Sequence, residues 1–393
     1  AAGLASGGGG VWDVRVLPTP AVAYLTKTRS ADLGVMLSAS HNAMPDNGIK
    51  FFNAEGNKLA DEIEAQIEAR MGEEWQRPVG DAVGRISSDS EGADEYVAHL
   101  LTTVDSLSGL KVVVDGANGA ASQVAPLTYR EAGAEVIAIH CAPDGYNINR
   151  DCGSTHLGDL QKAVVEHGAD DRLKLVLLGN LGIGHDGDAD RCLAVDASGA
   201  LVDGDQLMAI IALAMRDAGR LAHDTVVATV MANLGFKQAM QRESISVVET
   251  AVGDRYVLEA MLASGYVLGG EQSGHVVMTE HATTGDGLLT ALQVMNRMVA
   301  TGASLAELAG VMRRLPQVLV NVSGVDKNAL ETCGAVSDAV SAAQEQLSDS
   351  GRVLLRKSGT EPLVRVMVEA QDEATATGVA QSLAQTVRDH LSL

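Results

Sequence analysis

The sequence has few aromatic residues and few cysteines, and it lacks any long apolar run. Only 3% of its 393 residues are aromatic although 46% are hydrophobic, so small aliphatic side chains must fill its cores. The four cysteines form no CxxC pair and no metal-site spacing, which argues against a disulfide framework and predicts a reducing, cytoplasmic location. Because no stretch of about 18 uninterrupted apolar residues occurs, we expect no membrane-spanning helix.

Positive charge is also scarce. The chain has 29 Lys and Arg against 51 Asp and Glu, a net charge of −22 at pH 7. Such a surface repels nucleic acid and anionic membranes, so we expect neither as a partner. An anionic substrate would be repelled too, unless basic side chains are concentrated where it binds. The start, AAGLASGGGG, has neither an initiator Met nor the regions of a signal peptide, and we expect the chain to begin inside a domain.

The length indicates several domains, in which short aliphatic runs alternate with helical patterns as in βα units. We predict strands over Val14–Leu17, Leu33–Leu37, Lys111–Asp115, Ala134–Ile139, Val226–Val230 and Tyr266–Gly270. We predict helices over Asp61–Met71, Asp203–Gly219 and Glu373–Leu391. Changes in composition place four domains at residues 1–105, 106–203, 204–315 and 316–393, the last a smaller α+β domain.

Residues 185–191 read HDGDADR, a loop with three alternating aspartates. Side chains at alternate positions of an extended backbone point to the same side, where three carboxylates would repel unless a cation lies between them. Oxygen ligands of this kind suit Mg²⁺. An EF-hand is excluded, because Arg191 and Ala197 stand where Gly and Glu are required. An acidic surface turn is the plainer alternative, but apolar runs on both sides favour a metal site made of Asp186, Asp188 and Asp190.

A second group of residues, RKSGTEPLVR at 356–365, combines a Ser/Gly turn with two arginines. Backbone N–H groups of such a turn can converge on an anion, and guanidinium forks match phosphate. An ordinary turn is the alternative. Two arginines beside it in so acidic a chain favour phosphate capture by Arg356, Ser358, Gly359, Thr360 and Arg365.

The GGEQSGH segment, residues 269–275, places donors and acceptors between glycines, as a sugar ring with many hydroxyls requires. Its candidate ligand-binding side chains are Glu271, Ser273 and His275, and a purely structural turn is equally compatible with the spacing. Arg255, in GDRYV, could reach a ligand or could form a salt bridge at the start of a helix.

The SASHN segment contains two candidate nucleophiles, Ser38 and Ser40. The adjacent His41 would suit a serine hydrolase, but the G-x-S-x-G elbow is missing. The acidic loop and the basic turn favour phosphoryl chemistry, in which one of these serines carries the group between two acceptors and Lys50 serves as acid or base. The plainer alternatives are that His41 only hydrogen-bonds the loop and that Lys50 is a solvated strand residue.

The segments SASHNAMPDNGIKFF, DGDADR, GEQSGH and RKSGTEP occur in an order that resembles the α-D-phosphohexomutase superfamily, and the resemblance covers nearly the whole chain. Gln272 and the GDRYV stretch are similar to its glucosamine branch. The resemblance implies an α/β, multi-domain fold around a cleft: three related mixed α/β domains, the first incomplete, and a smaller α+β C-terminal domain.

The resemblance also implies roles for individual residues. Ser40 would be the phosphoserine and would join the three aspartates in holding Mg²⁺. Lys50 would be the general acid/base, and we expect His41 and Arg191 to take part in catalysis. Glu271 and Ser273 would hold sugar hydroxyls, with His275 and Arg255 beside them. The phosphate that does not react would bind Arg356, Ser358, Gly359, Thr360 and Arg365.

The implied reaction converts glucosamine 6-phosphate to glucosamine 1-phosphate through a glucosamine 1,6-bisphosphate, and it feeds UDP-N-acetylglucosamine and cell-wall synthesis. A homodimer is expected by the same resemblance. The alternatives are phosphomannomutase or phosphoglucomutase activity, an inactive truncated binder of sugar phosphates and, more remotely, a serine hydrolase. Three departures from the family pattern are expected. The usual N-terminal segment would be missing, which motivates the inactive alternative; Ala43 and Lys357 stand where proline is usual, and Asp171–Asn180 reads as an insertion.

Overall fold

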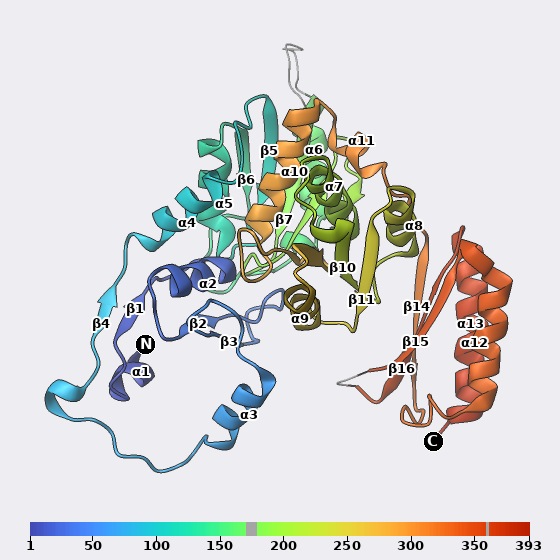
Figure 1. Ribbon diagram of the computed structural model, residues 1–393, viewed down its shortest axis with the longest axis horizontal. Helices are drawn as coiled ribbons and strands as arrows, with labels where there is room; N and C mark the ends of the chain where they lie inside the picture. The colour runs from blue at the N-terminus through green and yellow to red at the C-terminus, as the bar shows by residue number, and fades with distance from the viewer. Residues whose placement is uncertain (170–178, 359–360) are drawn as a thin grey trace. The chain divides into compact units, whose positions relative to one another are not determined.

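The computed structural model describes residues 1–169, 179–358 and 361–393. The chain divides into two compact units, one holding residues 1–231 and 245–311 and the other holding residues 232–244 and 312–393. The first unit contains mixed sheets, whereas the sheet of the second is antiparallel throughout (Figure 1). The expected insertion at Asp171–Asn180 lies almost wholly outside the described residues.

The largest sheet of the first unit has five strands in the order β6-β5-β7-β8-β9. They are β5 (Leu110–Asp115), β6 (Glu135–Ile139), β7 (Gly179–His185), β8 (Cys192–Val195) and β9 (Leu201–Val202). The first three strands in that order run parallel, and β8 and β9 then alternate in direction. Three consecutive valines of β5, at 112–114, are fully buried, as expected of a strand covered on both faces. Helices α5 (Ala121–Glu131) and α6 (Gly158–Ala169) pack against this sheet.

The second sheet of this unit repeats that topology with four strands, in the order β11-β10-β12-β13. The strands are β10 (Thr225–Thr229), β11 (Ser246–Thr250), β12 (Leu268–Gly270) and β13 (Val276–Met278). If the first four strands of each sheet are numbered 1 to 4 along the chain, both sheets have the spatial order 2-1-3-4. In both, strands 1 to 3 are parallel and strand 4 is antiparallel to strand 3. The accompanying helices are α7 (Gly204–Asp217), α9 (Asp254–Ser264), α10 (Gly287–Thr301) and α11 (Leu305–Ala309). The prediction of related α/β domains is confirmed by this repeat.

Residues 1–101 form two small sheets of two strands each. Strands β1 (Val11–Asp13) and β4 (Ile86–Ser88) pair in parallel, and β2 (Gly34–Leu37) and β3 (Ile49–Phe52) pair antiparallel. The helices are α1 (Ala2–Ser6), α2 (Thr19–Thr28), α3 (Asp61–Ala69) and α4 (Gly92–Leu101). The predicted strand over Val14–Leu17 is wrong, because Arg15 has a φ of 62°, which a strand cannot contain, and Pro18 then caps α2.

Aspartate side chains cap the N-termini of two helices of the first unit, α7 and α10. The Asp203 side chain accepts a hydrogen bond from the Gln206 N–H in a capping box, so the predicted start of this helix at Asp203 is confirmed. The Asp286 side chain caps α10 in the same way, accepting from the Leu289 N–H. The amide of Gly287, the first residue of α10, donates to the carbonyl of Ala189 at 3.0 Å. The start of α10 is therefore attached to the predicted metal loop.

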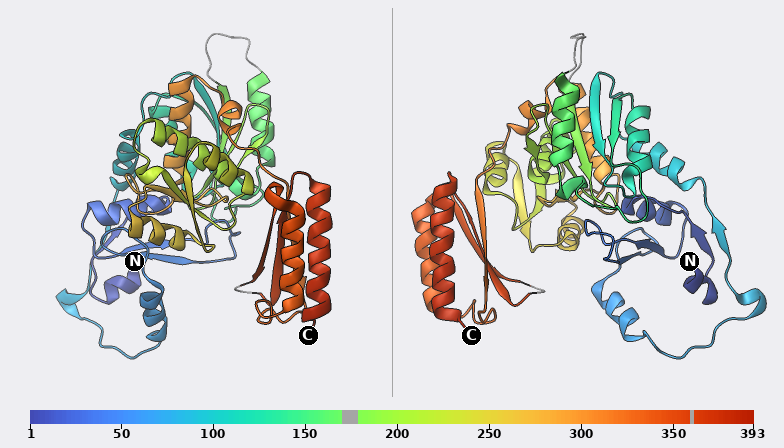
Figure 2. Two further views of the ribbon diagram at one scale, coloured as in Figure 1. Left: turned by 45° about the vertical axis from the view of Figure 1, so that its right-hand side comes forward. Right: turned by 180° about the vertical axis from the view of Figure 1, so that it is seen from behind.

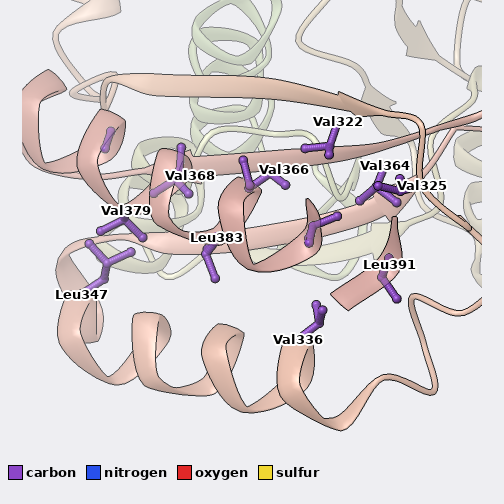
Figure 3. Packing of buried hydrophobic residues seen from close by; sticks show 14 of the residues in the cluster. Val322, Val325, Val336, Leu347, Val364, Val366, Val368, Val379, Leu383 and Leu391 are labelled. Atoms are coloured by element: carbon purple, nitrogen blue, oxygen red, sulfur yellow. The ribbon is translucent and has the colours of Figure 1, made fainter. Parts of the chain in front are cut away.

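The second unit is built on an antiparallel sheet in the order β14-β16-β15. Its strands are β14 (Gln317–Ser323), β15 (Arg352–Lys357) and β16 (Leu363–Glu369), and its helices are α8 (Leu234–Arg242), α12 (Gly334–Leu347) and α13 (Glu373–Leu391). Helices α12 and α13 lie side by side on one face of the sheet (Figure 2). Val364, Val366 and Val368 alternate along β16 and pack with Val379 and Leu383 of α13 (Figure 3). The residues between these valines therefore face away from the helices.

Short 3₁₀ helices occupy Gly80–Ala82, Gly153–Thr155, Ala222–Asp224 and Ser348–Ser350. Among the helices in the described ranges, none combines the length and the apolar character needed to cross a membrane.

Candidate active site

The three aspartates of the predicted metal loop converge in the turn between β7 and β8. One carboxylate oxygen from each of Asp186, Asp188 and Asp190 lies within 4.8 Å of the others. The residues are 1%, 1% and 3% exposed, so their charges are removed from water. Ala189 has a φ of 54°, a left-handed turn that bends the loop between the second and third aspartates. The structure therefore brings together the residues that the alternating spacing predicted.

The donor set fits a hard divalent cation. Among the side chains that the structure describes, the Oδ1 atoms of Asp188 and Asp190 are buried with no hydrogen-bond partner. Burial, followed by the charges of Asp190 and Asp188, raises the pKa of Asp186 well above its usual range. Buried, unpaired carboxylate oxygens are costly unless a cation binds them, and all the ligands here are oxygens. The three carboxylates could therefore hold a metal ion.

Lys50 of β3 reaches the same carboxylates from the N-terminal part of the chain. Its Nζ lies 2.6 Å from Asp188 Oδ2 and 2.8 Å from Asp190 Oδ2. Burial opposes the charge of Lys50, but Asp190 and Asp188 raise its pKa above the ordinary value. Lys50 is therefore an ammonium group at neutral pH, bound to two of the three aspartates.

Ser40 faces the third aspartate. Its hydroxyl donates to Asp186 Oδ2 at 2.8 Å, and its N–H donates to the Ser38 hydroxyl at 2.8 Å. Its φ is 55°, a left-handed conformation that few non-glycine residues adopt. A groove of about 820 Å³ opens beside it, lined in part by Asn118 and Asp188. Of the two serines in SASHN, Ser40 is the one in contact with the metal loop.

His41 lies beside Ser40 without the partner that a hydrolase needs. Its Nδ1 is 3.4 Å from Ser40 Oγ and 3.4 Å from an Arg191 guanidinium nitrogen. Burial, and after it the charge of Arg191, lowers the pKa of His41. In a Ser-His-Asp triad a carboxylate orients the imidazole, but among the described residues no carboxylate is hydrogen-bonded to His41. The serine hydrolase alternative therefore has no support in the geometry.

The GGEQSGH segment forms the turn of the β12–β13 hairpin and contacts the metal loop. Glu271 accepts from the Gly253 N–H at 3.1 Å and from the Ser273 hydroxyl at 3.4 Å. A Cβ on Gly274 would lie 2.0 Å from the carbonyl oxygen of Cys192, so the hairpin packs directly on β8. His275 is 2% exposed, and its Nε2 lies 4.0 Å from Asp190 Oδ2. The predicted sugar loop and metal loop are therefore neighbours.

Arg255 is not linked to this cluster by any contact in the described residues. It pairs with Asp61 and with Glu259, whose carboxylate lies 2.8 Å from Arg255 Nε. Its neighbour Asp254 turns toward the site instead, pairing with Lys58 and lying 3.4 Å from His275 Nε2. Of the two interpretations of Arg255, these contacts match the salt bridge at the start of a helix.

The predicted phosphate-binding residues that the structure describes lie in the second unit. Arg356 and Arg365 are directly opposite each other on β15 and β16, on the face away from the helices. Burial, with the charge of Arg365 second, lowers the pKa of Arg356. Ser358 is 3% exposed, and its hydroxyl accepts from the Glu361 N–H at 3.2 Å. Gly359 and Thr360 lie outside the described residues.

Two contacts to the site were not predicted from the sequence. The Thr19 hydroxyl donates to Asp188 Oδ2 at 2.5 Å, and its N–H donates to the Asp188 carbonyl at 2.9 Å. The side-chain amide of Asn149 donates to the carbonyl of Ser40. These partners are 169 and 109 residues apart, so no local pattern could have indicated them.

Four family models match the chain in order. They are described as phosphoglucomutase/phosphomannomutase alpha/beta/alpha domains I, II and III, at residues 1–77, 94–199 and 203–315, and the C-terminal domain, at residues 295–386. The phosphoglucosamine mutase of Streptomyces griseus subsp. griseus is 62% identical over 396 residues, covering 99% of this chain and 85% of the relative. The exact boundaries proposed from composition stay a prediction.

Two solved structures share the fold. A phosphoglucomutase/phosphomannomutase family protein from Burkholderia thailandensis has a TM-score of 0.78 and 23% identity, covering 99% of this chain and 84% of the other. The N-acetylphosphoglucosamine mutase of Aspergillus fumigatus, solved with GlcNAc-6P and magnesium, has a TM-score of 0.72 and 19% identity, covering 95% of this chain and 93% of the other.

Proposed function

This chain belongs to the phosphoglucosamine mutase family of phosphohexomutases, and we propose that it converts glucosamine 6-phosphate to glucosamine 1-phosphate with Ser40 as phosphoryl carrier. It is an isomerase that acts by intramolecular phosphotransfer. The observation that carries the role of Ser40 is its 2.8 Å hydrogen bond to Asp186, in a buried set of three carboxylates. A hydroxyl held there can be linked to a phosphoryl group, whose negative charge Lys50 and a cation held by the carboxylates would offset.

In this proposal phosphorylated Ser40 gives its phosphoryl group to the 1-hydroxyl of glucosamine 6-phosphate. The bond from phosphorus to Oγ breaks, a bond to the sugar oxygen forms and the proton of the 1-hydroxyl is released to solvent, which yields glucosamine 1,6-bisphosphate. The bisphosphate reorients in the site, and its 6-phosphoryl group then returns to Oγ while the departing 6-oxygen takes up a proton from solvent. Because both halves use one serine, the enzyme is regenerated in its phosphorylated form.

The charged state of Lys50 supports a role as the acid of the first half. As an ammonium group it can protonate Oγ when that oxygen leaves, and by microscopic reversibility the amine takes the proton back when Oγ attacks. The neutral ring of His41, 3.4 Å from Oγ, can hold the hydroxyl in place, with Arg191 beside it offering positive charge to the phosphoryl oxygens.

We propose Mg²⁺ as the metal, held by Asp186, Asp188, Asp190 and an oxygen of phosphorylated Ser40. An all-oxygen set with phosphate as a further ligand is the environment that this ion prefers, and when bound it supplies positive charge to the phosphoryl oxygens. The two buried carboxylate oxygens without hydrogen-bond partners support the assignment.

We assign the residues that bind the sugar and its non-reacting phosphate from the chemistry of their side chains. Glu271, Ser273 and His275 present acceptors and a donor next to the metal loop, which suits sugar hydroxyls. Arg255 remains a proposed ligand of the substrate. The cross-strand pair of arginines supports phosphate binding in the second unit by Arg356, Ser358, Gly359, Thr360 and Arg365.

The proposed product would feed UDP-N-acetylglucosamine and cell-wall synthesis, and we place the reaction in the cytoplasm, where four cysteines without paired spacing are expected to stay reduced. A homodimer remains a prediction. The glucose and mannose activities are not favoured, because the high-identity relatives are phosphoglucosamine mutases.

A Mg²⁺-dependent assay seeded with bisphosphate tests the proposal, with glucosamine, glucose and mannose 6-phosphates measured side by side. We expect the highest kcat/KM for glucosamine 6-phosphate, a phosphate on Ser40 by mass spectrometry, and loss of turnover in Ser40→Ala. Full turnover in Ser40→Ala would refute the role of Ser40. Sugar-phosphate binding without turnover of any substrate would instead favour the inactive binder.

A further inference from the structure

The side chain of Asn149 contacts the serine loop from a distant part of the first unit. Its Nδ2 donates to the carbonyl oxygens of Ser40, at 2.9 Å, and of Asn42, at 2.8 Å. These two carbonyls belong to the residues before and after His41, so a single amide group bridges the backbone on both sides of the histidine. Asn149 is 6% exposed, which shelters both hydrogen bonds from competition with water.

Asn149 is itself firmly anchored. Its N–H donates to the Ala117 carbonyl at 2.9 Å. The fully buried carboxylate of Asp115 accepts from the Ala117 N–H at 2.9 Å, from His140 Nδ1 at 2.9 Å and from the Gly153 N–H at 3.0 Å. The loop after β5, the loop of residues 140–152 and the 3₁₀ turn that begins at Gly153 are thereby tied to one carboxylate. Asn149 lies within the loop of residues 140–152, and its amide has a fixed position.

The metal loop packs against the hydrogen bond between the Asn149 amide and the Ser40 carbonyl. A Cβ on Gly187, between two of the aspartates, would lie 2.6 Å from Asn149 Nδ2 and 2.6 Å from the Ser40 carbonyl oxygen. The absence of a side chain at this position therefore lets the metal loop lie directly against the amide. Ser40 needs such support, because its left-handed φ of 55° is disfavoured for a residue with a side chain.

We propose that Asn149 is a positioning residue for the phosphoryl carrier. Its two hydrogen bonds hold the Ser40 backbone in the conformation that aims Oγ at Asp186, and it touches neither the sugar nor the transferred group. This rests on the proposed role of Ser40. Because Oγ is the leaving group in one half of the reaction and the nucleophile in the other, both halves depend on the same backbone conformation. Loss of the amide should lower kcat and leave substrate binding intact.

Two variants and a matched control test this role. Asn149→Asp keeps the size and tolerates the left-handed φ of 55° at this residue, but it removes both N–H donors. Asn149→Ala removes the whole group. The control, Asn147→Ala, lies in the same loop, where among the described residues its side chain bonds the Asp144 N–H and the Ala142 carbonyl and not the serine loop. We expect kcat to fall roughly 10- to 100-fold in both Asn149 variants, with KM within about twofold of wild type, and the control to behave as wild type.

A second measurement follows the phosphorylation of Ser40 directly. Dephosphorylated enzyme is mixed with glucosamine 1,6-bisphosphate, and the phosphate on Ser40 is followed over time by mass spectrometry. The rate should fall by the same factor as kcat. A folded Asn149→Asp enzyme with kcat and phosphorylation rate within twofold of wild type would overturn the proposal, as would an effect on KM alone. Failure of both variants to fold would assign Asn149 to the fold instead.

Ser40→Ala, measured in parallel, separates the two hypotheses. If it still turns over substrate, the proposed role of Ser40 is wrong, whatever Asn149 does. If it is inactive while Asn149→Asp is fully active, only the role of Asn149 is wrong.

Discussion

Replacing Asp286 by asparagine should make the protein more stable at neutral pH and remove part of its pH dependence. Asp286 is 2% exposed, and its carboxylate accepts from the Leu289 N–H at 3.0 Å and from the Tyr96 hydroxyl at 2.8 Å. Burial is the main cause that raises the pKa of Asp286, to about 6, against the opposing effect of these hydrogen bonds. The folded protein therefore keeps a proton on this group at pH values where the unfolded chain has lost it.

The sign and size of the effect follow from that difference. A carboxyl with a higher pKa in the folded state contributes most to stability below its unfolded pKa of 3.8, and this contribution is lost as the pH rises to about 6. The difference between these two pKa values, at 1.36 kcal/mol per pH unit, corresponds to about 3 kcal/mol in total. Roughly 1.4 kcal/mol of this falls between about pH 5 and pH 8. Because asparagine cannot ionise, the variant does not lose this stability as the pH rises.

Urea unfolding of both proteins at several pH values, followed by circular dichroism, measures the effect. The stability of Asp286→Asn relative to wild type should rise by roughly 1.4 kcal/mol from about pH 5 to pH 8. Asp372 is the matched control, an exposed helix cap whose pKa is lowered by its hydrogen bond from the Thr375 N–H. Asp372→Asn should be less stable than wild type at neutral pH by an amount that stays constant from about pH 5 to pH 8 and shrinks only as the pH falls below the unfolded pKa of 3.8. A flat difference for Asp286→Asn would refute the reasoning from burial.

Four further predictions concern the site. Thr19→Val removes the hydroxyl bonded to Asp188 and should weaken Mg²⁺ binding roughly tenfold in a titration of activity, with Thr19→Ser restoring it. Lys50→Met should lower kcat at least about 100-fold with little change in KM. Arg356→Gln should raise KM for the sugar phosphate roughly tenfold while changing kcat less, measured by steady-state kinetics. Mg²⁺ at about 100 times its Kd should stabilise the protein by about 2.7 kcal/mol in urea unfolding, and EDTA should reverse this; no change would contradict the metal site.

The residues of the site could be predicted where their spacing is local. Asp186, Asp188 and Asp190 stand at alternate positions, and this pattern alone indicates convergence on one cation. The choice of Ser40 over Ser38 rested on a resemblance, and the structure shows why the two differ. Ser40 bonds the metal loop, whereas Ser38 accepts the Ser40 N–H.

The α/β fold class and most of the predicted strands were correct, but one predicted strand was wrong and the strand order could not be predicted. Buried valine runs such as that of β5 identify strands because both faces of the strand are apolar. The strand expected over Val14–Leu17 failed, since its apolar residues gave no sign of the left-handed Arg15. The shared strand order of the two mixed sheets also could not be derived, because strand neighbours are set by crossovers and not by local sequence.

The sequence by itself determined which chemical groups are available: three carboxylates in one short loop, a serine beside a histidine, and arginines around a Ser/Gly turn. Only the tertiary structure decided which of them meet. Lys50 and Asp188 are 138 residues apart, and Asn149 and Ser40 are 109 apart, yet each pair is in hydrogen-bonding contact. Such contacts arise because the packing of buried strands and helices brings loops together, and chain separation leaves no local pattern by which they could be read.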